Sequence, residues 1–274
     1  MKKTFVVLAI LLAAGLSSRV FGSVVVLGPT DAANDPPLNG SAAINTTSSQ
    51  AAIGTGAWQA NGTSASQLYL YASPFIAGGS SSTELGLGQL TVSQLNSLSL
   101  STFLSPANVA NDGNWFLTIY TAPRTGGETS WYGNRLILEP YLAANYSNPA
   151  NQWNTFSTAL GTDQLRVDDT ALSASLGFYG EPTLANVQSG AITWSTYFAG
   201  GSSTPTTYGS QNIEAIVLST ASGWAAGFNG LVDNVNINTS QGNVQFNLEA
   251  VPEPTTLALL GLGLAGLVLI RKRK

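Results

Sequence analysis

The segment Val244-Gln245-Phe246-Asn247-Leu248 alternates apolar and polar side chains without a break. Successive side chains of a β-strand point to opposite faces, so this order places three apolar groups on one face and two amides on the other. Such a strand predicts a sheet with one buried face and one face that meets water. Leu231 to Ile237, a few residues earlier, continues the pattern.

Short segments of the same kind recur between residues 23 and 250. They are Gln67–Tyr71, Trp115–Tyr120, Arg135–Glu139, Ser173–Phe178, Ala191–Phe198 and Ile213–Leu218. Clusters rich in Gly, Ser and Thr separate them, as at residues 77–82 and 200–205, and are typical of turns. Many strands joined by such loops predict an all-β fold, an antiparallel β-sandwich. The length suits one large domain over residues 23–250 and would at the limit allow two small ones.

One short helix is expected among the strands. Thr91-Val92-Ser93-Gln94 has the spacing of a capping box, and Leu95 and Leu98 follow at the three-residue spacing of one helix face.

Charged residues are few and unevenly placed in this chain of 274 residues. The two ends hold seven of the ten basic side chains. Residues 23–270 hold three arginines, no lysine and all fourteen acidic residues, a net charge of −11 (three minus fourteen). A body of that charge repels phosphate backbones, which excludes a nucleic-acid-binding function.

The chain contains no histidine and no cysteine. Catalytic triads, thiolate nucleophiles, histidine-ligated metals, disulfides and iron–sulfur clusters are therefore excluded. Because only 9% of residues are charged, the surface has to consist largely of Ser, Thr, Asn, Gln and Gly, a composition typical of secreted β-proteins.

Residues 1–22 have the features of a signal peptide. Met1-Lys2-Lys3 is positively charged, and Thr4 to Leu16 is an apolar run too short to span a bilayer comfortably. Signal peptidase is expected to cleave before Ser23, with cleavage after Ser18 as the alternative. A buried core helix is the structural alternative, but the lysine pair and the position of the run favour export.

The other end combines three features. Val251-Pro252-Glu253-Pro254 holds the chain extended, because proline restricts its own backbone and that of the residue before it. Thr255 to Ile270 carries no charge and predicts a single transmembrane helix, roughly 24 Å long against a bilayer core of roughly 30 Å. The basic residues 271–274 favour the cytoplasmic side, which places the body outside the cytoplasmic membrane.

This order of features resembles the PEP-CTERM sorting signal of exported bacterial proteins, over residues 251–274. The resemblance implies recognition of Pro252, Glu253 and Pro254 by an exosortase, a membrane transpeptidase-like cysteine protease that cuts nearby and passes the protein to the envelope or extracellular matrix. Leu257 to Ile270 would be a transient anchor. The stop-transfer tail would be Arg271, Lys272, Arg273 and Lys274. The alternative is an ordinary C-terminal anchor without processing.

Gly223 to Ile237 is similar to the closing segment of lectin-like and galactose-binding-like jelly-roll modules, where an aromatic and glycine-rich stretch leads into a last strand that begins with an Asp-Asn pair. The similarity implies a jelly-roll-like sandwich, and it raises sugar binding by analogy alone.

Two clusters combine aromatic rings with amides, the groups that stack on sugar rings and bond their hydroxyls. The candidate carbohydrate-binding residues are Trp131, Tyr132 and Asn134 in the first cluster and Trp153 in the second. The alternative is that these rings fill the core or cover its ends, as most Trp and Tyr do in a sandwich.

Acidic residues offer two further readings. A hydrolase needs paired carboxylates, for which Glu139, Asp163, Asp168, Asp169 and Glu181 are available without a defining spacing. Asp168 and Asp169 are expected in a solvated turn beside Asp163. A structural calcium ion would need oxygen ligands, and the candidate acids, which lack the spacing of a calcium loop, are Asp31, Asp35, Asp112, Asp163, Asp168 and Asp233.

We therefore expect an exported, non-enzymatic β-sandwich that works without a cofactor in the cell envelope or extracellular matrix. The leading hypothesis is a structural or adhesive module associated with exopolysaccharide. A specific, lectin-like carbohydrate-binding module is the alternative, and a polysaccharide hydrolase is the third.

Overall fold

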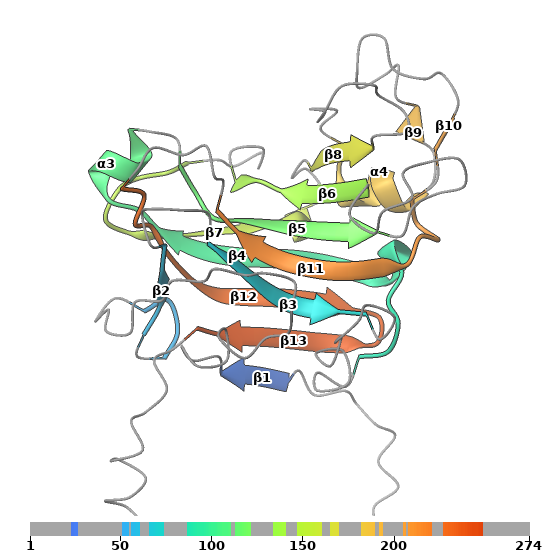
Figure 1. Ribbon diagram of the computed structural model, residues 1–274, viewed down its shortest axis with the longest axis horizontal. Coiled ribbons are helices and arrows are strands. Elements are labelled where there is room, and N and C mark those ends of the chain that lie inside the picture. The colour runs from blue at the N-terminus through green and yellow to red at the C-terminus, as the bar shows by residue number, and fades with distance from the viewer. Residues whose placement is uncertain are drawn as a thin grey trace, which may run out of the picture.

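The computed structural model describes residues 23–26, 51–54, 56–60, 66–73, 87–110, 113–121, 134–140, 147–160, 165–169, 182–189, 192–193, 205–206, 208–220 and 227–248. The strands in these ranges form two large sheets that overlap in the view of Figure 1. The predicted all-β sandwich is confirmed.

The first large sheet has six strands in the order β1–β13–β12–β4–β7, and β2 also pairs with β12. These strands are β1 (Ser23–Val26), β2 (Trp58–Gln59), β4 (Leu95–Phe103), β7 (Trp153–Ser157), β12 (Leu231–Thr239) and β13 (Gly242–Asn247).

The second large sheet has five strands in the order β3–β11–β5–β6–β8. They are β3 (Gln67–Ala72), β5 (Phe116–Thr121), β6 (Asn134–Leu138), β8 (Arg166–Asp169) and β11 (Ile213–Ser219). A separate pair consists of β9 (Ile192–Thr193) and β10 (Pro205–Thr206). The helices are α3 (Pro106–Val109), α4 (Leu184–Ser189) and the 3-10 turns η1 (Val92–Gln94) and η3 (Thr158–Leu160).

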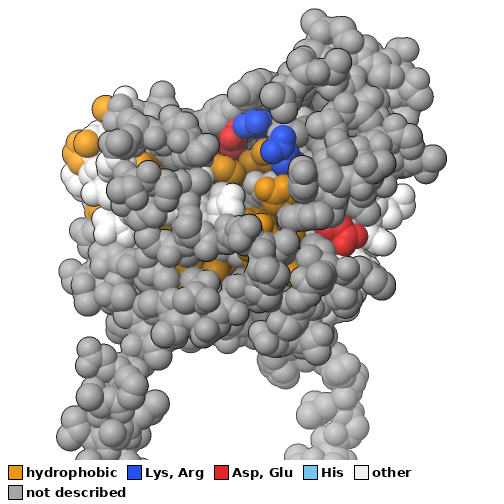
Figure 2. Space-filling view, viewed as in Figure 1, with side chains coloured by type: hydrophobic (Ala, Val, Ile, Leu, Met, Phe, Trp, Pro, Cys, Tyr) orange, Lys and Arg blue, Asp and Glu red, His pale blue; other side chains and the backbone are white. Residues whose placement is uncertain are grey.

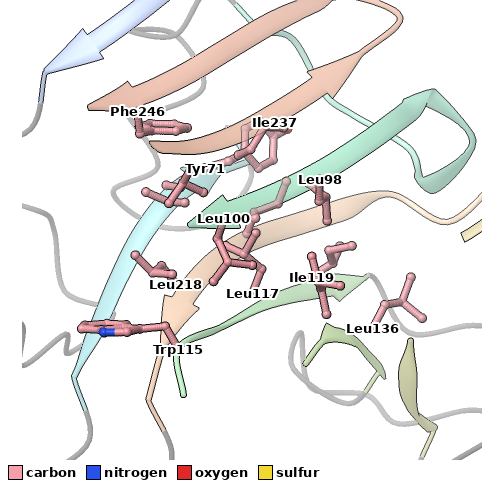
Figure 3. Close-up of a cluster of buried hydrophobic side chains, with 14 of the residues drawn as sticks. Tyr71, Leu98, Leu100, Trp115, Leu117, Ile119, Leu136, Leu218, Ile237 and Phe246 are labelled. Carbon is pink, nitrogen blue, oxygen red and sulfur yellow. The ribbon is translucent and has the colours of Figure 1, made fainter. Parts of the chain in front are cut away.

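One hydrophobic core lies between the two sheets. Ile237 and Phe246 contribute to it from the six-stranded sheet, and Leu117 and Ile119 from the five-stranded sheet (Figure 3). All four side chains are fully buried, and burying one of this kind contributes roughly 1.5–3 kcal/mol. The core therefore needs the inward faces of both sheets.

The alternation at the end of the body is confirmed. Val244, Phe246 and Leu248 are buried, whereas Gln245 and Asn247 are only partly covered. The apolar groups of β13 thus face the core and its amides face outward.

Most of the other predicted strands are present. They are found as β3, β5, β6, β11 and β12, each shifted by no more than two residues at either end. Of Ala191–Phe198 the structure describes two residues, as β9, and Ser173–Phe178 lies outside the described residues.

The first strand departs from the antiparallel prediction. β1 pairs in parallel with β13, with Ser23 opposite Val244 and Val26 opposite Asn247. Ser23 is also the residue expected to follow signal-peptide cleavage. The first residues of the mature chain would then lie at the edge of the sheet, beside the strand that leads to the C-terminal signal.

The predicted helix is present as a single 3-10 turn, η1. The prediction that the helix continues through Leu95 and Leu98 is wrong. The Thr91 backbone N–H donates to Gln94 Oε1 at 2.8 Å, as the capping box requires. Leu95 and Leu98, however, belong to β4. On β12 the neighbours Asn238 and Thr239 pair with Ser97 and Leu95, so one extra residue, Asn96, bulges out of β4.

The bulge explains why the sequence suggested a helix. An extra residue in a strand reverses the alternation, so two residues three apart come to share a face. Leu95 and Leu98 are both buried, and Asn96 is exposed. A spacing typical of a helix is here a property of a bulged strand.

Helix α3 begins with a local sequence signal, Ser-Pro, that the strand predictions did not use. Ser105 is its N-cap and Pro106 follows at the first helical turn, and the Ser105 hydroxyl accepts the Asn108 backbone N–H at 3.3 Å. Serine before proline is favoured at a helix start.

Deletion of Asn96 should convert β4 into a regular strand in which Leu95 and Leu98, then two positions apart, still both face the core. The free energy of unfolding, measured by denaturant titration, should therefore change by less than the roughly 2 kcal/mol that exposing one leucine would cost. Deletion of Ser99 from the regular part of β4 is the comparison, because it turns Leu98 and Leu100 to opposite faces and should lower the free energy of unfolding by about 2 kcal/mol or more. An equal loss in the two deletion variants would contradict this account of β4.

Candidate functional site

The C-terminal end of the body is held by a buried carboxylate. Asp233 in β12 has an exposed fraction of 0%. Its Oδ2 accepts the backbone N–H groups of Ala52 at 3.0 Å and Ile53 at 2.9 Å. Its Oδ1 accepts those of Asn234 at 2.6 Å and Leu248 at 3.0 Å. One side chain therefore connects β12 with the end of the next strand, β13, and with a segment about 180 residues earlier in the sequence.

A second bulge places this carboxylate on the outer face of the sheet. Asp233 pairs with Ser101 and Asn236 pairs with Ser99, so β12 has one residue more than β4 between these pairs. Asn234 takes up the extra length with a φ of +50°, a left-handed conformation that asparagine tolerates better than most residues. Without the bulge, Asp233 would share the core-facing side of Val235.

Asp233 also marks the place where the neighbour of β12 changes. Val235 pairs with Phe246 of β13, whereas Val232 pairs with Trp58 of β2. Between these pairs, the carboxylate accepts N–H groups from the end of β13 and from the segment before β2. It satisfies backbone donors for which β12 supplies no backbone partner.

Burial raises the pKa of the Asp233 carboxyl above its ordinary value of 3.8. The backbone N–H bonds from Ile53, Leu248, Asn234 and Ala52 favour the ionised form and oppose the rise without cancelling it.

The outer face of the six-stranded sheet is built from uncharged polar side chains. Cross-strand pairing aligns them in two rows. The first row is Asn243, Asn238 and Ser97, and the second is Gln245, Asn236, Ser99 and Ser157. We call these seven residues, all partly exposed, the polar face. Neighbouring strands lie about 4.8 Å apart, so each row repeats at a distance comparable to the length of one sugar unit.

Hydrogen bonds between side-chain amides order part of this surface. Gln245 Nε2 donates to Asn234 Oδ1 at 2.7 Å, and Asn236 Nδ2 donates to the same oxygen at 3.1 Å. Asn96 Nδ2 donates to Asn238 Oδ1 at 3.2 Å. Since a side-chain amide offers two donor hydrogens and two acceptor positions, these bonds hold the groups in place and leave capacity for a ligand.

Charge is separated between the two sheets. In the strands of the six-stranded sheet, Asp233 is the one charged residue, and it is buried. The other charged residues of the described ranges lie in the five-stranded sheet or directly after β6: Arg135, Glu139, Arg166, Asp168, Asp169 and Glu214. Figure 2 shows arginine and acidic side chains beside hydrophobic ones where β6 and β8 lie in Figure 1.

Trp153 lies on the same side of the sheet as the polar face. It pairs with Phe103 across β7 and β4, with ring centroids 5.8 Å apart and planes tilted by 59°. Two residues further along each strand, the Ser101 and Thr155 hydroxyls are 2.8 Å apart. Both rings are partly exposed, so they form an aromatic border beside the polar rows.

The structure describes two of the predicted carbohydrate-binding residues, one from each cluster, and they lie in different sheets. Asn134 begins β6 in the five-stranded sheet, whereas Trp153 begins β7 in the six-stranded sheet. Trp131 and Tyr132 lie outside the described residues. Sequence reasoning missed the polar face itself, although the alternation Leu98-Ser99-Leu100-Ser101 of β4 was a usable signal for it.

The prediction of a solvated turn at Asp168 and Asp169 is wrong. Both belong to β8, where they pair with Arg135 and Asn134 of β6. Buried Val167 follows partly exposed Arg166 there, but a run this short gives little periodicity to detect.

The other acidic candidates are only partly described. Glu139 Oε1 accepts a hydrogen bond from Arg166 Nη1 at 3.2 Å. Within the described ranges, no three acidic side chains gather closely enough to hold a metal ion. The structural calcium ion stays a prediction, and the remaining acids, namely Asp31, Asp35, Asp112, Asp163 and Glu181, lie outside the described residues.

Comparison with known proteins identifies the end of the chain. Residues 250–274 match the family model described as the PEP-CTERM protein-sorting motif. No curated protein and no solved structure matches the chain. The chain is therefore an exported protein that carries a PEP-CTERM motif. It is a substrate for processing by an exosortase and is anchored transiently at the membrane.

The matched residues include Pro252, Glu253, Pro254 and the basic tail of residues 271–274, whose individual roles stay predictions. The predicted signal peptide, the sorting motif and the predicted transmembrane helix lie outside the described residues. Among the residues that are described, no helix has the length and apolar composition needed to cross a membrane. The jelly-roll likeness stays a prediction too.

Mass spectrometry of the native exported protein should find no peptide beyond about Thr256, because processing removes the apolar segment and the basic tail. Glu253→Ala should retain the tail residues 271–274, since the acid between the two prolines is the expected recognition group. Mature material that still carries Arg271–Lys274 would contradict removal of the motif.

Asp233→Asn should lower the free energy of unfolding by about 2 kcal/mol or more, because an amide nitrogen cannot accept backbone N–H bonds and leaves buried donors unpaired. The loss should depend on pH. Above pH 3.8 and up to its raised pKa, the folded carboxyl binds a proton more tightly than the unfolded one, so rising pH lowers the stability of the unmodified protein.

Denaturant titrations of both proteins across this range isolate the effect of Asp233. The stability advantage of the unmodified protein over the Asn variant should be largest below pH 3.8 and should shrink as pH rises. An advantage that grows with pH would show that the hydrogen bonds outweigh burial in setting this pKa.

Proposed function

We propose that the exported body is a non-enzymatic structural or adhesive module that associates with exopolysaccharide through the polar face. The proposal places the mature protein at the outer surface of the cell or in the extracellular matrix. The observation that carries it is the pair of cross-strand rows of amides and hydroxyls, in a sheet whose one charged strand residue is buried.

The chemistry of the polar face suits a hydroxyl-rich polymer. Amides and hydroxyls both donate and accept hydrogen bonds, as sugar hydroxyls do, so neither partner has to bury an unmatched charge. Because each row crosses three or four strands, we expect many weak contacts, and the total affinity should grow with the length of polymer bound. Such binding suits a matrix component better than a receptor for one small sugar.

A specific carbohydrate-binding module is the second candidate function. It is favoured by the Trp153–Phe103 pair, whose partly exposed rings border the polar rows. An aromatic ring offers a flat apolar surface for the C–H face of a sugar, and the hydroxyls of Ser101 and Thr155 lie along the same two strands. In this function one ring contributes most of the affinity.

Ser97→Asp with Ser157→Asp should weaken binding to a neutral exopolysaccharide by about tenfold or more, because each carboxylate would lose hydration on contact. Ser157 Oγ accepts the Ala159 backbone N–H, a bond that aspartate can also make. Binding of the native processed protein is measured by co-sedimentation with the purified polymer.

The control carries the same two charges elsewhere: Ser210→Asp with Asn229→Asp, both at exposed positions away from the polar face. Unchanged binding is expected for the control. Trp153→Ala separates the two functions, since complete loss of binding selects the specific module and a small loss selects the extended face. If all variants bind as the native protein does, the polar face is not the contact surface.

A further inference from the structure

The sorting motif begins two residues after a buried core residue. The Leu248 side chain has an exposed fraction of 0%, and its backbone N–H is bound to Asp233. The family match begins at residue 250, and Pro252 follows Leu248 by four residues. Four residues of fully extended chain span at most about 14 Å. Very little chain therefore separates the core from the motif.

This arrangement restricts any enzyme that cleaves next to Pro252. A peptidase binds its substrate as an extended strand with residues on both sides of the bond, because backbone hydrogen bonds along the strand supply affinity. On the N-terminal side of Pro252, only residues 249–251 lie beyond the buried Leu248. A longer extended segment becomes available only when Leu248 and Asn247 leave the sheet.

The contacts of Asn247 and Leu248 with the neighbouring strands permit this release. Phe246 makes the last ladder pair with β12, opposite Val235. Beyond it, the Leu248 N–H donates to the Asp233 side chain, and on the other side Asn247 pairs with Val26 of β1. Releasing two residues costs far less free energy than unfolding the sandwich, because the free energy of local opening at a strand end is well below the free energy of global unfolding.

We propose that Asp233 and Leu248 form a latch that controls C-terminal processing. In the closed state Leu248 fills the core and the enzyme meets a shortened substrate. In the open state the end of β13 extends the segment that the enzyme binds. When opening and closing are fast, the processing rate follows the population of the open state. Asp233 acts here as a positioning residue, and the inference does not depend on the proposed glycan contact.

The test is a pulse-chase measurement of tail removal from the full-length precursor, in cells that contain the processing enzyme. Leu248→Ala should accelerate processing about tenfold, because it removes the apolar contact that closes the latch. Asp233→Asn should accelerate it in the same direction. A flexible spacer of six Gly and Ser residues between Glu249 and Ala250 should also accelerate it, without any change in the core.

The spacer also tests the mechanism. In the spacer variant, Leu248→Ala should add no further acceleration, because the enzyme no longer needs the end of β13. Leu136→Ala is the matched control, a leucine of equal burial in β6 of the other sheet, and it should process at the rate of the unmodified precursor.

Three results would overturn the latch: an unchanged rate for Leu248→Ala, an unchanged rate for the spacer variant, or an equal acceleration by Leu136→Ala. The last result would mean that general destabilisation sets the rate. If Asp233→Asn fails to fold, the other variants still decide the question.

Discussion

The buried carboxylate of Asp233 is the constraint on which the arrangement of the six-stranded sheet depends. A charge is costly to bury unless hydrogen bonds surround it, and here four backbone N–H groups do so. Those groups belong to the segment before β2, to β12 itself and to Leu248 at the end of β13. Loss of the carboxylate would leave donors unpaired in all three places. The same group thus closes the sheet where its strand partners change and fixes the point at which the body gives way to the sorting motif.

Within the described residues, the six-stranded sheet is also the side of the molecule with few charged residues. Its strands carry no charged residue besides Asp233, and its outer face presents amides and hydroxyls in register. The remaining charged residues of the described ranges lie in the five-stranded sheet or directly after β6, among them the ion pair of Arg166 with Glu139. A protein with one neutral hydrogen-bonding face suits a matrix rich in sugar hydroxyls.

Two single-residue bulges decide which side chains face the core. Asn96 in β4 turns Leu95 inward, and Asn234 in β12 turns Asp233 outward. Each bulge adds one residue to a strand with a period of two, so every side chain beyond it changes face. The pattern at Thr91 to Leu98 therefore predicted a helix where most of the residues form a strand. Asp233 lies in a strand that the sequence predicted, but no local signal showed that its carboxylate would accept bonds from other segments.

The sequence by itself determined the fold class, most of the strands and the C-terminal sorting motif. Val244 to Leu248 alternates without a bulge, and the C-terminal motif is contiguous, so both depend on local order alone. Tertiary structure decided what depends on contacts between distant segments: the parallel pairing of β1, the rows of the polar face, and the place of Trp153 beside them rather than with Asn134. The physical reason is that register and facing are set by the partner strand, and a single chain segment does not encode its partner.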